Sequence, residues 1–141
     1  MSSRKRTRKF ILKVESNPAA GVLKKHTVEK GKRFVFIDDA NFPEGKMYVI
    51  ARAVKNIRKP YASATLRSHT VDGAMLFMGN GTDMKGLKVE VQLGDDRYIL
   101  DSPASVYVPA GTKHTYTILR GSGLYMKVLQ APGGDYNAVT M

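Results

Sequence analysis

The chain has 141 residues, of which 43% are apolar, with 23 Lys/Arg against 12 Asp/Glu and no cysteine. This length fits one domain with a substantial core, and the missing thiols exclude disulfide stapling and thiolate chemistry. No apolar run approaches the roughly 18 residues that a membrane span requires, and the N-terminus lacks the hydrophobic segment of a secretory signal. We therefore expect a cytoplasmic protein without a membrane partner.

The positive charge is confined to the first part of the chain. Residues 1–60 hold 16 Lys/Arg and 5 Asp/Glu, whereas residues 61–141 hold 7 of each. We predict that residues 1–9, which contain the dense run 4–9, form a basic flexible arm, and that residues 10–141 form a single domain. Such an arm can contact phosphates. No nucleic-acid-binding module accompanies it, so we expect no nucleic-acid partner beyond non-specific contact by the arm.

Short β-prone runs separated by Gly, Pro and Asp turns follow along the chain. Strands are predicted at residues 10–14, 33–37, 47–54, 74–78, 87–93, 97–100, 105–108, 115–119 and 124–129. The clearest is 87–93, where apolar and polar residues alternate. Turns are predicted at 94–96 and 121–123, while 22–31 is ambiguous between a short helical turn and a loop. No long amphipathic helix is predicted, so the expected fold class is all-β, a sandwich or a barrel.

One turn carries the most specific pattern. It reads Pro109-x-Gly111-x-x-His114. Proline fixes φ and glycine accepts a positive φ, so the pair makes a rigid corner. The histidine then lies at the start of the next strand, where the scaffold fixes the direction of its side chain.

The pattern resembles the second conserved motif of the cupins, P-x-G-x-x-H, and the resemblance covers about residues 46–130. It implies a double-stranded β-helix barrel, a relative of the jelly roll, here with extra N-terminal strands. The first cupin motif normally supplies two histidines and a glutamate before a Gly turn. In this chain the only histidine there is His69, and the glutamate position falls on Asp72 or Gly73. The two histidine positions fall on Thr65 and Arg67, or on Leu66 and Ser68.

The resemblance implies metal ligands at His69, Asp72 and His114. Two imidazoles and a carboxylate could hold one divalent ion, Fe, Mn, Zn or Ni. Because the ligand set is incomplete, the alternative of a cupin without metal stays open. His26 is interpreted as a surface histidine.

Acid–base chemistry without a metal is a further hypothesis. In it, His114, Tyr107 and Tyr116 are catalytic residues. Arg67 and Tyr125 would bind the substrate, and Lys127, if it faces inward, could also pair with an anion. Alternation alone leaves open which of these side chains face the barrel interior.

Three functional classes remain. The first is a small cupin enzyme (an oxygenase, isomerase, cyclase or decarboxylase) acting on an oxygenated or anionic molecule inside the barrel. The second is a cupin that only binds such a ligand, and the third is a protein that acts through its basic arm. Fold resemblance does not choose among them. The extra N-terminal strands further predict a homodimer.

Overall fold

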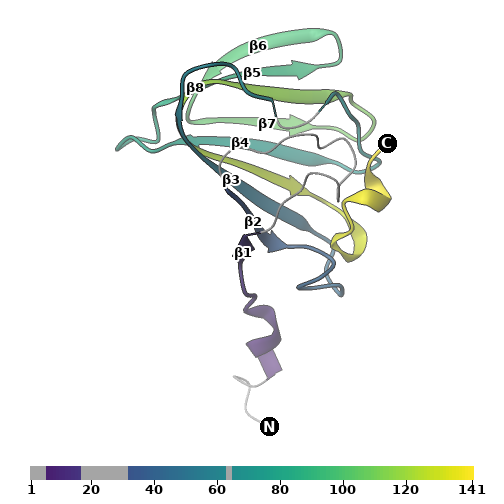
Figure 1. Ribbon diagram of the computed structural model, residues 1–141. Helices are drawn as coiled ribbons and strands as arrows, with labels where there is room; N and C mark the ends of the chain where they lie inside the picture. The colour runs from purple at the N-terminus through teal and green to yellow at the C-terminus, as the bar shows by residue number, and fades with distance from the viewer. Residues whose placement is uncertain (1–5, 17–31, 63–64) are drawn as a thin grey trace.

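The structure is a computed structural model that describes residues 6–16, 32–62 and 65–141. Residues 1–5 of the predicted arm and the ambiguous segment with His26 lie outside the described residues. The fold is all-β, and the described residues form eight strands and three short 3-10 helices (Figure 1). The strands are β1 (Glu15–Ser16), β2 (Lys32–Ile37), β3 (Tyr48–Ile57), β4 (Gly73–Gly79), β5 (Leu87–Leu93), β6 (Asp96–Asp101), β7 (Ala104–Val108) and β8 (His114–Leu129). The 3-10 helices are η1 (Arg8–Phe10), η2 (Pro132–Gly134) and η3 (Asn137–Val139).

Two layers of antiparallel strands enclose the interior. One layer has the order β1-β2-β3-β8-β4-β7 and uses the second half of β8. The other consists of β6, β5 and the first half of β8, and single bridges add Tyr61 and Arg67 to it. Strand β8 therefore belongs to both layers, and Figure 1 shows it bending from one to the other.

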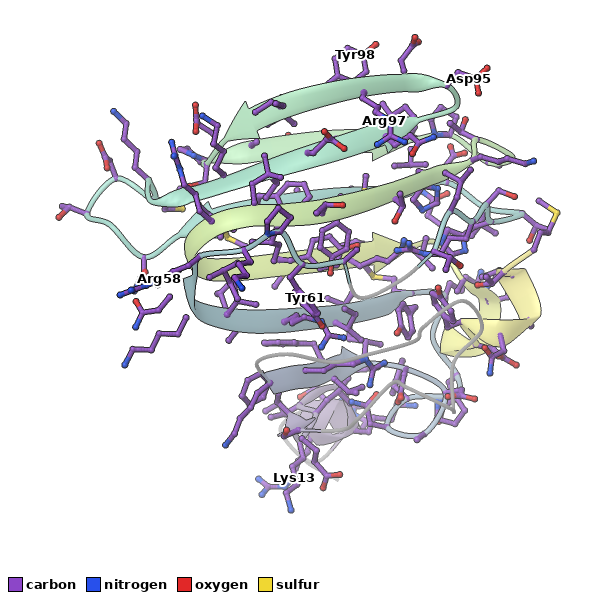
Figure 2. The ribbon with its side chains drawn as sticks, turned by 45° about the horizontal axis from the view of Figure 1, so that its top comes forward. Lys13, Arg58, Tyr61, Asp95, Arg97 and Tyr98 are labelled. Carbon is purple, nitrogen blue, oxygen red and sulfur yellow. The ribbon has the colours of Figure 1, made fainter. Side chains whose placement is uncertain are left out.

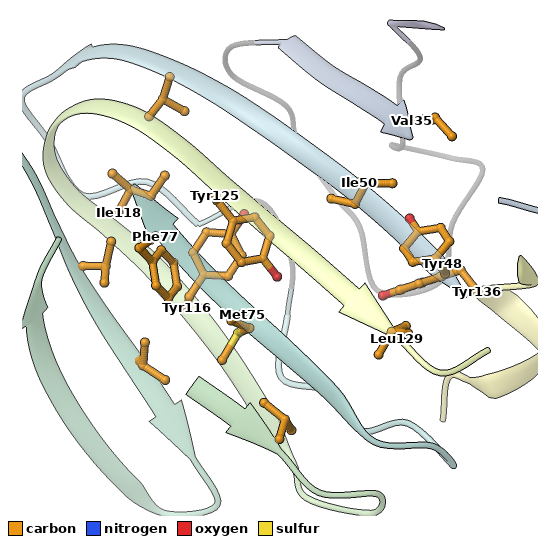
Figure 3. Packing of buried hydrophobic residues seen from close by; sticks show 14 of the residues in the cluster. Val35, Tyr48, Ile50, Met75, Phe77, Tyr116, Ile118, Tyr125, Leu129 and Tyr136 are labelled. Atoms are coloured by element: carbon orange, nitrogen blue, oxygen red, sulfur yellow. The ribbon is translucent and has the colours of Figure 1, made fainter. Parts of the chain in front are cut away.

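Alternating side chains fill the space between the layers. In β5, Leu87, Val89 and Val91 are buried, as the period-2 pattern predicts. Met75 and Phe77 of β4 meet them from the opposite layer, within one continuous apolar cluster (Figure 3). The outer face of β5 carries Lys88, Glu90 and Gln92, and this difference between its two faces sets the register of the strand.

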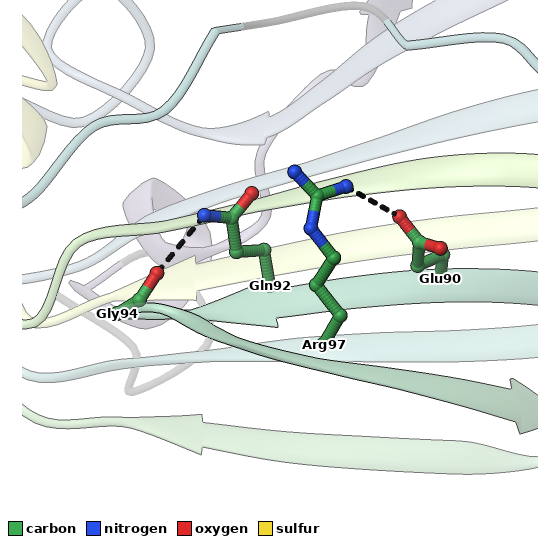
Figure 4. Close-up of polar contacts among 4 residues, drawn as sticks. All are labelled: Glu90, Gln92, Gly94 and Arg97. Carbon is green, nitrogen blue, oxygen red and sulfur yellow. Dashed lines mark hydrogen bonds and ion pairs between the residues drawn. The ribbon is translucent and has the colours of Figure 1, made fainter.

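The β5–β6 hairpin illustrates the solvated outer face. Arg97 donates to Glu90 at 3.0 Å, and the Gln92 amide donates to the Gly94 carbonyl at 2.9 Å (Figure 4). Asp95 and Tyr98 project from the top edge of the fold, whereas Arg97 lies over the hairpin (Figure 2). Exposed pairs of this kind contribute about 0.2–1 kcal/mol each to stability. The hairpin is therefore stabilised mainly by its buried side chains and by the backbone hydrogen bonds between its strands.

The predicted all-β barrel is confirmed, and two local predictions are wrong. Residues 10–14 are not a strand, because η1 ends at Phe10 and the first strand begins at Glu15. Residues 121–123 do not separate two strands. Gly121 and Gly123 have φ of 109° and 159°, and β8 runs through them as one bent strand that pairs with β3, β4 and β5.

The C-terminal segment closes one end of the barrel. Tyr136 and Val139 are buried in the core cluster, and Thr140 forms a bridge with His69. In the described part of the chain, no helix combines the length and apolarity that a membrane span needs.

We expect Gly121→Ala to destabilise the fold strongly. A Cβ there would lie 1.9 Å from the Gly86 carbonyl oxygen, at a φ of +109°. Gly94→Ala is the matched control, since its φ is +59° but no atom lies within 4 Å. Urea denaturation should give a loss of about 1 kcal/mol for the control and about 3 kcal/mol or more for Gly121→Ala. Equal losses would contradict the importance of this close approach.

Candidate functional site

The Pro109–His114 turn ties the motif histidine to the segment that carries His69. Gly111 N–H donates to the His69 carbonyl at 2.8 Å. His114 then pairs with Arg67 through both backbone hydrogen bonds, at 2.7 and 3.1 Å. The corner predicted from Pro and Gly thus places His69, His114 and Arg67 together at one end of the barrel.

The bend in β8 brings two rows of its own side chains face to face. His114 and Tyr116 point inward from the first half, and Tyr125 and Lys127 point inward from the second. Lys127 Nζ lies 3.1 Å from His114 Nε2. The Tyr116 and Tyr125 rings stack with centroids 4.0 Å apart (Figure 3). Both contacts cross the interior between the layers.

Hydrogen bonds assign the tautomer of His114. Its Nδ1 lies 2.9 Å from the Thr112 carbonyl, which can only accept, so Nδ1 carries the hydrogen. The lone pair of Nε2 in the neutral ring therefore accepts from Lys127.

The same argument leaves His69 with a free lone pair. Its Nδ1 lies 3.1 Å from the Thr140 hydroxyl, which itself donates to the Tyr136 carbonyl at 2.6 Å. His69 Nδ1 must therefore donate, and Nε2 is a bare acceptor. This nitrogen has no hydrogen-bond partner among the described residues. The two imidazole centroids are 5.0 Å apart.

Burial controls the charge of the cluster. Arg67, His69, His114 and Lys127 are each at most 3% exposed. Burial, followed by the Lys127 charge, lowers the pKa of His69 to about 2 and that of His114 to about 3. Burial, followed by the nearby Arg67 charge, also lowers the pKa of Lys127 well below its usual value. The imidazoles are neutral at pH 7, while the Arg67 guanidinium keeps its charge.

Two further polar atoms in the interior lack partners. Arg67 Nε and the Tyr125 hydroxyl have no hydrogen-bond partner in the described part of the chain. Buried polar atoms are nearly always paired in folded proteins. Together with His69 Nε2, they are two donors and one acceptor available to a bound molecule.

Asp72 and Tyr107 lie outside this cluster, contrary to the expected pocket. The Tyr107 hydroxyl donates to the Asp72 carboxylate, and Ala110 N–H donates to it at 2.8 Å. Tyr107 is 63% exposed. The bond from Tyr107, and then that from Ala110, lower the pKa of Asp72. Strand register directs this pair to the outer face, where it braces the turn from outside.

A separate hollow of about 780 Å³ lies at the other end of the barrel. Its lining includes Arg58, Lys85, Lys88 and Arg120, with Asp101 as the acidic residue. In β5 the residue that pairs with His114 is Leu93, whereas Leu87 at the opposite end lines this hollow. Figure 2 shows Arg58 near this end, beside the long loop before β5.

Comparison with known proteins identifies the fold of this chain. No protein-family model and no curated protein matches the chain. Among solved structures, oxalate decarboxylase from Bacillus subtilis matches with a TM-score of 0.56 and 14% identity, over 85% of this chain and 30% of that chain. A conserved protein of unknown function from Streptococcus pyogenes matches with a TM-score of 0.50 and 12% identity, over 71% of this chain and 73% of that chain. The chain has a cupin fold. Identities this low establish the fold alone.

The residues of this cupin barrel do not fit the three-ligand metal site implied by the sequence. His114 Nε2, which would have to bind the ion, accepts from Lys127 instead, and Asp72 is on the outer face. Within the described ranges, no group of three His, Asp or Glu side chains is close enough to share an ion. An amine with Arg67 beside it occupies the interior in place of a carboxylate.

The structure brings together most of the other predicted residues. His69, His114, Arg67, Tyr116 and Tyr125 all face the interior of the cupin barrel. The roles of Tyr136 and Thr140 were not predicted. Their contacts with the His69 segment depend on the C-terminal chain folding back across the barrel end, and no local pattern signals such a contact.

We expect the stability of the barrel to fall on acidification. The unfolded chain protonates histidine near pH 6.5, whereas the folded pKa values are about 2 and about 3. Below pH 6.5 the unfolded state therefore binds more protons, and stability, complete above that pH, falls toward pH 3. The slope is about 1.4 kcal/mol per pH unit for each imidazole. Urea denaturation at several pH values measures it.

Nuclear magnetic resonance separates this effect from that of the carboxylates. The ring signals of His69 and His114, assigned with single His→Gln variants, should not titrate between about pH 5 and 8. A midpoint near 6.5 for either ring would contradict the neutral, buried state.

Proposed function

We propose that the interior of the barrel binds one small anionic, oxygenated molecule. The observation that carries this proposal is a buried pair of basic side chains, the charged Arg67 guanidinium and the Lys127 amine, with no acidic partner among the described residues. The described ion pairs all involve exposed or half-exposed groups. A buried positive charge without a counter-ion is costly, and a carboxylate or phosphate on the ligand would supply the missing charge.

The unpaired atoms narrow the chemistry of the ligand. Arg67 Nε and the Tyr125 hydroxyl can donate to an anionic oxygen. His69 Nε2 can only accept, so it favours a ligand that also carries a hydroxyl or another donor. A hydroxy acid has both features. Oxalate, the dianion in the name of the Bacillus subtilis neighbour, is a useful second probe.

Calorimetric titration with lactate, oxalate and phosphate tests the proposal. We expect at least one anion to bind, and Arg67→Gln and Lys127→Met to weaken it about tenfold or more, since each removes a charge-assisted contact. Arg120→Gln is the matched control, because Arg120 lines the hollow at the other end. Loss of binding in Arg120→Gln alone would place the anion there and contradict the proposal.

Lys127→Met also separates binding from folding. Replacing a buried charge with an apolar side chain of similar length often leaves stability unchanged or raises it. We therefore expect this variant to keep its melting temperature while losing affinity. If every probe binds equally well to wild type and Lys127→Met, the amine is not part of the site.

We further propose that two copies of the chain associate through the N-terminal segment. Phe10, Ile11 and Val14 are 59%, 81% and 43% exposed. They precede β1, which pairs with β2 on one side. Large exposed apolar side chains at a sheet edge favour a partner that covers them.

Light scattering tests this association directly. The wild type should have the mass of a dimer at micromolar concentration, and Ile11→Ser should shift it toward the monomer. Ile99→Ser is the control, because Ile99 on β6 is 60% exposed and lies at the opposite edge of the fold. A monomeric wild type, or equal effects of the two variants, would overturn the association.

A further inference from the structure

Lys127 has surroundings that differ from those of an ordinary lysine. Its side chain is 3% exposed, and its Nζ donates to an imidazole nitrogen at 3.1 Å. Arg67 is its charged neighbour, and the described residues provide no carboxylate to pair with it. Desolvation and a neighbouring cation are the two features that activate lysine amines as nucleophiles.

The contact with His114 directs the amine. Because His114 Nδ1 is bound to the Thr112 carbonyl, its Nε2 must accept, and one Nζ–H of Lys127 points at it. Burial and the Arg67 charge favour the neutral form of this amine, and the lone pair of the neutral amine must point away from the imidazole. Register places Lys127 between Ile50 of β3 and Met75 of β4, so apolar side chains flank the amine along its own layer.

The remaining unpaired groups suit a carbonyl next to a carboxylate. Arg67 interacts electrostatically with both Lys127 and Tyr125, so the three groups can act on one small molecule. The guanidinium would hold the carboxylate. The Tyr125 hydroxyl, which has no partner among the described residues, would donate to the carbonyl oxygen and polarise it.

We propose that Lys127 forms an imine with the carbonyl carbon of a 2-oxo carboxylate held by Arg67. This inference rests on the anion site proposed above and names its substrate class. The amine nitrogen attacks the carbonyl carbon, and the C–N bond forms as the carbonyl π bond opens. The former carbonyl oxygen then leaves as water with both hydrogens of the amine. The step consumes one amine and one carbonyl and needs no oxidant or reductant.

Reductive trapping tests the proposal on the full chain. Wild-type protein is incubated with pyruvate and sodium cyanoborohydride, which reduces an imine to a stable secondary amine. We expect one reduced pyruvyl group per chain, and peptide mapping should place it on Lys127. Trapping there should be about tenfold or more faster than at any surface lysine, because the site holds the two reactants together. Acetone, which lacks the carboxylate, should label Lys127 poorly.

Two variants and one competitor control the experiment. Lys127→Met should lose the adduct, and its folding is checked by circular dichroism. Lys88→Met, which removes a lysine that lines the other hollow, should retain it. Lactate, which has the carboxylate but no carbonyl, should protect Lys127 from labelling.

The possible failures are distinguishable. If pyruvate binds by calorimetry in an Arg67-dependent manner but no adduct is trapped, the imine is wrong and the anion site stands. If labelling is spread over surface lysines and is unchanged in Lys127→Met, the imine is also wrong. If no probe anion binds and no adduct forms, both proposals fall.

Discussion

Strand β8 is the constraint on which the interior depends, because it belongs to both layers of the barrel. It bends at Gly121 and Gly123, where the backbone approaches the neighbouring strands too closely for a Cβ. The bend turns the two inward faces of one strand toward each other. His114 and Lys127 are thirteen residues apart in sequence, yet their nitrogens are 3.1 Å apart. The central contact of the site is thus a direct consequence of the fold.

The contact also explains why the cluster differs from the metal site that the motif implies. An imidazole nitrogen has one lone pair, and a hydrogen bond from an amine uses it. With Asp72 braced against Tyr107 on the outer face, no carboxylate of the described residues joins the imidazoles, and the positive charge comes from Arg67, beside the Lys127 amine. This arrangement is the basis of the proposed anion site, in which the neutral imidazoles are hydrogen-bonding groups.

Much of the fold could be predicted from local pattern. The alternation of apolar and polar residues predicted both ends of β5, because one face of this strand meets the core and the other meets solvent. The Pro109–His114 turn indicated where the candidate site lies. The direction of Arg67 and Lys127 could not be predicted, since a shift of one residue in register reverses the face of a strand. The continuity of β8 was missed for a related reason. Two glycines two positions apart suit a turn equally well, and only the pairing of both halves with other strands decides between a turn and a bend.

The cost of the interior supports a role in binding over a role in folding. Apolar side chains at these positions would pack as Met75 and Phe77 do, with no atoms left unpaired. Each unpaired buried polar atom instead costs about 1–3 kcal/mol, and His69 and Tyr125, which each have one, both interact electrostatically with Arg67, which has another. These unpaired donors and the unpaired acceptor accompany a buried amine. A bound molecule of complementary charge would pair with them and offset the free-energy cost of burying them. Folding alone offers no such compensation, and this cost is therefore an argument for the proposed preorganised site.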